Sequence, residues 1–156
     1  MNILVAHSIT DESFLDYGEP ITPVGDLTPY SDHDAKLYFD SGPIRFYVMQ
    51  LEHQGERVSA MTRHTHCSQC LGSADAQPWW IALAAIDLTS DEINHGTLKL
   101  FRVEPRQAIK LTPGTWHAGP YFKTKTAAFY NLELSNTKVA DHMTRQLATP
   151  VTLRLD

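Results

Sequence analysis

The feature that most limits the fold of this chain is a series of short apolar or alternating runs that begins near Ile44. Each run has the length of a β-strand, and turn-rich segments separate one run from the next. These segments do not contain the long helices that a parallel βαβ sheet needs between its strands. The runs are residues 45–52, 58–62, 79–88, 98–103, 108–111 and 127–134. The sequence therefore predicts an all-β sandwich or barrel.

The chain before Ile44 looks different. Residues 8–17 carry Ser, Thr and Asp as possible caps, and Gly18 follows as a stop signal, so one short N-terminal helix is expected there. Residues 19–43 are rich in proline and glycine and should be mostly loop. Only the first few residues and the stretch after His142 look like tails. With no internal repeat, the 156 residues are expected to form a single domain, 1–156.

Charge and hydropathy argue against several classes of partner. The formal charge is −5, and the 13 basic residues include no run that could follow a phosphate backbone, so nucleic acid is not expected. The longest apolar stretch, residues 79–86, is much too short to cross a bilayer, so no membrane span is expected. The first residues, MNILVAHSITDES, lack the pattern of a signal peptide. A cytoplasmic protein is therefore expected.

Histidines are the strongest chemical signal. His64 and His66 form an H-x-H pair after a predicted strand, and an extended chain would point both rings to the same side, as in a metal chelate. A third histidine, His117, follows the turn Pro113-Gly114 about fifty residues later, and could meet the pair across a barrel. The alternative is that His64 and His66 are merely exposed residues at the end of a strand.

Two cysteines lie beside the H-x-H pair, at Cys67 and Cys70. Without a secretory context they are expected to be reduced rather than disulfide-bonded. Together with the two histidines they could be zinc ligands, but four ligands so close together on an extended chain would face opposite sides. Small core residues are the simpler interpretation, and the role of the pair stays open.

The order H-x-H, then P-G-x-x-H, resembles the paired motifs of the cupin superfamily. This resemblance implies a double-stranded β-helix barrel, or jelly roll, and a divalent metal ion held by histidines of both motifs. The ligands would be His64, His66, Gln69 and His117, with Gln69 where cupins usually have glutamate. The ion could be Mn, Ni, Zn or Fe. Cupin barrels often form homodimers, so a homodimer is expected as well.

Within the cupins, the chain resembles the ureidoglycolate lyase family. The resemblance rests on Phe14-x-x-Tyr17-Gly18-Glu19-x-Ile21, on Arg63-His64 followed by Gln69, on Gly114-Thr115-Trp116-His117, and on the strand from Phe129 to Glu133. It departs from the family where Thr65 replaces a proline, where His66 appears, and where Leu71-Gly72-Ser73 replaces an apolar Phe-x-Pro stretch. The resemblance implies a carbon–nitrogen lyase that cleaves ureidoglycolate, or a similar 2-hydroxy-2-ureido acid, to glyoxylate and urea in allantoin and purine breakdown.

This reaction needs a base for the hydroxyl proton, an acid for the departing nitrogen and an anchor for the carboxylate. The expected catalytic residues are His64, His117 and Glu133. The expected substrate-binding residues are Arg63, Arg45, Asn131 and Trp116. Strand alternation places Asn131 and Glu133 on one face, and Arg45, Tyr47 and Met49 on one face of another strand.

Two other functions are compatible with the sequence. The extra His66 would suit a different metal-dependent cupin, either an oxygenase or an isomerase. The neutral Gln69 would suit a non-catalytic protein that binds a small molecule. Metal-dependent oxygen uptake would distinguish the first of these, and a stable complex without turnover would distinguish the second.

Overall fold

The computed structural model describes residues 2–156, and strands dominate it. The strands are β1 (Ile3–Ser8), β2 (Gly18–Ile21), β3 (Ile44–Glu52), β4 (Arg57–Arg63), β5 (Gln69–Ser73), β6 (Trp79–Ala84), β7 (Lys99–Val103), β8 (Ala108–Leu111), β9 (Trp116–Tyr121), β10 (Thr126–Leu134) and β11 (Met143–Arg154). The helices are α1 (Asp11–Phe14), the 3-10 turn η1 (His95–Thr97) and α2 (Thr137–Ala140). None of these helices is long and apolar enough to cross a membrane.

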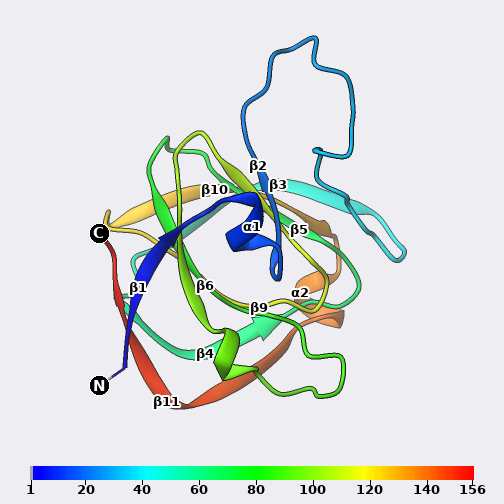
Figure 1. Ribbon diagram of the computed structural model, residues 1–156. Coiled ribbons are helices and arrows are strands. Elements are labelled where there is room, and N and C mark those ends of the chain that lie inside the picture. Colours follow the sequence, from blue (N-terminus) through cyan, green and yellow to red (C-terminus); the bar gives the residue numbers. More distant parts are fainter. Residues whose placement is uncertain (1) are drawn as a thin grey trace.

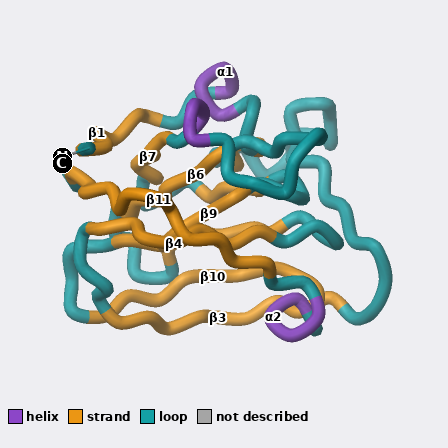
Figure 2. The backbone as a smooth tube through the Cα atoms, turned by 90° about the horizontal axis from the view of Figure 1, so that it is seen from below, coloured by secondary structure: helices purple, strands orange, loops and turns teal. Residues whose placement is uncertain are grey.

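The strands form two hydrogen-bonded units. Six of them close a barrel in the order β1-β11-β4-β9-β6-β7, and five form a second sheet in the order β2-β8-β5-β10-β3. Figure 2 shows β10 and β3 running beneath β4 and β11 as a separate layer. The prediction of an all-β, cupin-like barrel with a short N-terminal helix is confirmed, although the helix is only four residues long.

Strand β6 belongs to two hydrophobic cores at once, which explains why all six of its residues are buried. Trp79, Ile81 and Leu83 pack in the core between the barrel wall and the second sheet. Trp80, Ala82 and Ala84 pack in the core inside the barrel. Alternation of side chains along a strand requires this split. Both neighbouring tryptophans, Trp79 and Trp80, are therefore buried, because both faces of β6 are covered.

Both segments that were expected to be tails contribute strands to the barrel. β1 pairs in parallel with both β11 and β7, and thus closes the barrel. β11 pairs with β4 along Met143 to Thr152, and Leu147, Val151 and Leu153 pack inside the barrel. By contrast, residues 22–38 form the loop that the proline and glycine content predicts, and Figure 1 shows it projecting from the barrel.

Candidate active site

Two histidine rings meet between the barrel and the second sheet. The ring centroids of His64 and His117 lie 5.0 Å apart. Both residues line a cavity of about 10 Å³ together with Gln69. The other lining residues are Cys67, Leu111, Thr112 and Thr115. A cavity of this size has room for about one water-sized guest.

Local chain geometry brings the two histidines together. β4 ends at Arg63, so His64 stands directly after the strand, and Thr62 pairs with His117 across the β4–β9 ladder. The turn before β9 is fixed to the same point, because the N–H of Gly114 donates to the carbonyl of His64 at 2.6 Å. Gly114 has a φ of 90°, a conformation that favours glycine.

Both rings are electrically neutral at neutral pH. Burial lowers the pKa of His64 below its ordinary value of 6.5. Burial, together with the neighbouring His64, lowers the pKa of His117 to about 3. The Nδ1 atom of His117 is buried and has no hydrogen-bond partner among residues 2–156, although part of the residue stays open to solvent. The site thus offers nitrogen lone pairs rather than positive charge.

A buried polar network stands behind Gln69. Its Nε2 donates to Oδ1 of Asn131 at 3.2 Å and to Oε2 of Glu133 at 3.3 Å. The hydroxyl of Tyr47 donates to Glu133 at 3.1 Å and accepts from Nδ2 of Asn131 at the same distance. Asn131 and Glu133 are 0% and 1% exposed. This network uses both hydrogens of the Gln69 amide, whose Oε1 has no partner among the described residues.

A larger groove adjoins the cavity at His117. Its volume is about 430 Å³, and His117 lines both spaces. The other groove residues are Gln54, Arg57, Ser59, Ala60, Thr62, Ala118, Gly119, Tyr121 and His142. No aspartate or glutamate lines the groove within residues 2–156, in a protein whose net charge is −5. The groove therefore suits a small anion.

A comparison with protein families identifies the family of the chain. The family model described as Ureidoglycolate lyase matches residues 1–148. The chain belongs to the ureidoglycolate lyase family. The match includes every residue of the cavity and of the network behind Gln69. A search of curated proteins gives no match. The family supports a ureidoglycolate lyase, and thus a lyase enzyme, as the function of the chain.

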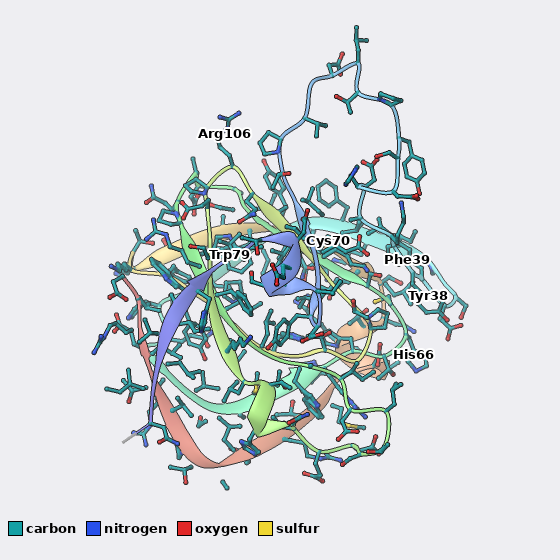
Figure 3. The ribbon with its side chains drawn as sticks, viewed as in Figure 1. Tyr38, Phe39, His66, Cys70, Trp79 and Arg106 are labelled. Atoms are coloured by element: carbon teal, nitrogen blue, oxygen red, sulfur yellow. The ribbon has the colours of Figure 1, made fainter. Side chains whose placement is uncertain are left out.

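One predicted metal ligand of this lyase family member lies elsewhere. The side chain of His66 is 56% exposed, and its Nδ1 lies 3.1 Å from Oδ2 of Asp40. Figure 3 shows it at the edge of the molecule, near Tyr38 and Phe39. The prediction that His66 shares a site with His64 is wrong, because the chain bends at residues 65 and 66 instead of continuing the strand, and His66 contacts Asp40 and does not line the cavity.

Two predicted substrate contacts of the lyase lie on the other side of the barrel wall. Trp116 is fully buried in the core inside the barrel. The Arg63 guanidinium lies 4.8 Å from that ring, and its Nη2 is 2.6 Å from Oδ1 of Asp91. Neither residue lines the cavity or the groove, since strand alternation turns Arg63 away from His64 and Trp116 away from His117.

The remaining predicted residues of the lyase are closer to the site. Asn131 and Glu133 face inward, but they stand behind Gln69 rather than lining the cavity. Arg45 is exposed and lies over the ring of Tyr47 at 3.5 Å. Arg45 thus reaches the network behind Gln69 only through Tyr47.

Both cysteines of the lyase are free thiols. Cys67 is buried and lines the cavity. Burial raises the pKa of Cys70 to about 11, so this thiol is protonated and unreactive at neutral pH.

Sequence reasoning missed two residues beside His64. Asp141 accepts a hydrogen bond from His64 through its carbonyl, and the ring of His142 lies 5.6 Å from the ring of His64. Both stand between α2 and β11, directly before the stretch that was expected to be a tail. The one sequence feature that could have pointed to this segment is His142, a third histidine near His64 and His117.

Proposed function

We propose that the chain cleaves ureidoglycolate to glyoxylate and urea at the junction of the His64–Gln69–His117 cavity and the adjoining groove. The observation that carries this proposal is the pair of neutral imidazoles, 5.0 Å apart, at the end of a groove without carboxylates. A neutral imidazole can accept the hydroxyl proton of the substrate. The groove has room for the substrate, whereas the cavity does not.

His64 is the base in this proposal. Its Nδ1 faces the carbonyl of Asp141, so the ring proton belongs on Nδ1 and the lone pair on Nε2. Nε2 takes the carbinol proton, the O–H electron pair forms the glyoxylate C=O bond, and the C–N bond breaks. The urea nitrogen receives the proton from the His64 imidazolium. All atoms of the substrate end in the two products, and no water is consumed.

We also propose that a divalent metal ion can occupy the cavity. The available donors are imidazole nitrogens of His64 and His117 and the unpartnered Oε1 of Gln69, which suit Mn, Ni, Zn or Fe. All three donors are neutral groups, and no cluster of three or more His, Cys, Asp or Glu side chains with a metal-binding arrangement occurs among residues 2–156. Such an ion would polarise the substrate hydroxyl. It would occupy the Nε2 lone pair of His64, so the proton transfer by His64 described above belongs to the metal-free site.

The test is release of urea and glyoxylate from ureidoglycolate by purified protein, with and without added metal, beside elemental analysis. Wild type, His64→Gln and His117→Gln are compared. Turnover in the wild type that falls at least a hundredfold in His64→Gln supports the base. Absence of urea release under every metal condition overturns the proposed function. About one equivalent of metal that both variants lose supports the metal site, and metal that both variants keep contradicts it.

We propose a homodimer formed through β3. This strand is an edge of the second sheet, where it pairs only with β10 over nine positions. Its outward residues Ile44, Phe46 and Val48 are 54%, 68% and 54% exposed. A long apolar edge strand favours pairing with an identical strand of a second copy. We further propose a cytoplasmic location, which suits two free thiols and can be tested by cell fractionation.

A further inference from the structure

The segment between α2 and β11 forms hydrogen bonds with the turn that follows His64. Asp141 contacts this turn twice, once through its carboxylate and once through its carbonyl. We infer that Asp141 is a positioning residue of the active site, which sets both the place and the tautomer of the His64 ring. The inference rests on the proposed function, since the reaction that it serves is the proposed one.

The carboxylate of Asp141 binds the backbone immediately after His64. Its Oδ1 accepts from the N–H of Thr65 at 2.9 Å, and its Oδ2 accepts from the N–H of His66 at 2.8 Å. The Thr65 hydroxyl also donates to Oδ1, at 3.3 Å. Charge-assisted bonds of this kind are stronger than bonds between neutral groups. The carboxylate therefore fixes a bend that would otherwise be an exposed loop.

The carbonyl of the same residue fixes the ring. Nδ1 of His64 lies 2.5 Å from the carbonyl oxygen of Asp141. A carbonyl oxygen can only accept, so Nδ1 carries the proton and Nε2 is left with its lone pair. One residue thus holds the main chain of the turn and decides which ring nitrogen is basic.

No other contact explains the carboxylate. Asp141 forms no ion pair with a lysine or arginine among residues 2–156, and all its side-chain hydrogen bonds go to Thr65 and His66. The opposite side of the turn is held separately, through the N–H of Gly114 and the carbonyl of His64. That bond fixes the backbone but leaves the ring free to rotate about its side-chain torsions. Holding the ring is the task left to Asp141.

Thr65 fits this arrangement. It supplies two of the donors to Asp141, one from its backbone and one from its side chain. A proline at this position, which the resemblance to the family leads one to expect, could supply neither. The departure at Thr65 therefore goes with a carboxylate clamp that needs the donors of this residue.

The experiment compares Asp141→Ala and Asp141→Asn with wild type. The matched control is Asp40→Asn, which removes a carboxylate on the other side of the same turn, 3.1 Å from Nδ1 of His66, and does not touch His64. The first readout is the tautomer of His64 by long-range ¹H–¹⁵N NMR on chelator-treated protein without substrate, assigned with His64→Gln. The second is kcat and KM for ureidoglycolate. Thermal denaturation identifies variants that do not fold.

The wild type and Asp40→Asn are expected to hold the proton on Nδ1 of His64. Asp141→Ala is expected to show a mixture of tautomers and a kcat lower by about tenfold or more, with KM within about threefold of wild type. Asp141→Asn keeps one acceptor and should lie between the two; if Asp141→Ala does not fold, Asp141→Asn decides by the same readouts.

Two results would overturn the inference. The first is a wild-type His64 with its proton on Nε2. The second is a folded Asp141 variant with the wild-type tautomer and wild-type kcat. Because the tautomer is measured without substrate, a protein that never releases urea refutes the proposed function while the NMR comparison still decides the role of Asp141.

Discussion

Acid should weaken this fold through His117 in a way that can be calculated. The pKa of His117 is about 3 in the folded protein and returns to its ordinary 6.5 on unfolding. Between these two values the unfolded chain binds a proton at this ring and the folded chain does not. The free energy of unfolding therefore falls as the pH drops from 6.5 toward 3. Each pH unit in this window costs about 1.4 kcal/mol. At pH 5 the free energy of unfolding should thus be lower by about 2 kcal/mol than at pH 8.

Urea denaturation of chelator-treated protein at pH 8 and pH 5 measures this loss, and His117→Gln isolates it. The variant cannot take up the proton, so its pH 8 to pH 5 decrease should be smaller than that of wild type by about 2 kcal/mol. His95→Gln removes an exposed histidine and serves as the control, with the wild-type profile expected. An equal decrease in wild type and His117→Gln would refute the argument that burial holds this ring neutral.

Three further changes have defined outcomes. Gln69→Glu places a second carboxylate 3.3 Å from Oε2 of Glu133, so it should destabilise the fold by up to about 4 kcal/mol at pH 8 and by less at pH 5; equal losses in urea at both pH values would contradict this. Gly18→Ala puts a Cβ atom into the space that the carbonyl oxygen of Lys110 occupies, so β2 must separate from β8, at a cost of about 1–3 kcal/mol in the same assay. Phe46→Lys should disrupt the proposed homodimer, and light scattering that finds the same dimeric mass in wild type and variant would refute pairing through β3.

The sequence predicts the strands best where one or both faces are covered by apolar partners. β6 and β10 alternate or run apolar throughout, and both were expected close to their observed starts, although the prediction for β6 continued to Leu88. The sequence did not predict β11, because most of its residues are exposed or half-buried and a break in register separates Gln146 from Val151. A strand of this kind has no apolar period, so only its pairing with β1 and β4 reveals it.

The sequence predicted the site residues that belong to recognisable motifs. The prediction failed where a contact between distant parts of the chain decides the position of a side chain. His64, Gln69 and His117 do line one cavity. His66 does not join them, because Asp141 binds the backbone at positions 65 and 66 and so holds the chain in a bend. That contact joins residues more than seventy positions apart, and no local sequence pattern predicts it.

The closure of the barrel by β1 has a consequence for the order of events during synthesis. Ile3 pairs with Thr152, so β1 cannot form this part of the sheet until β11, about 150 positions later, has been synthesised. Until then, β11 is missing from the cylinder, and apolar residues such as Val58 and Met61 lack part of their cover. Nascent chains should therefore expose apolar surface until β11 has been synthesised, and chaperones that shield such surface should improve the yield of active protein.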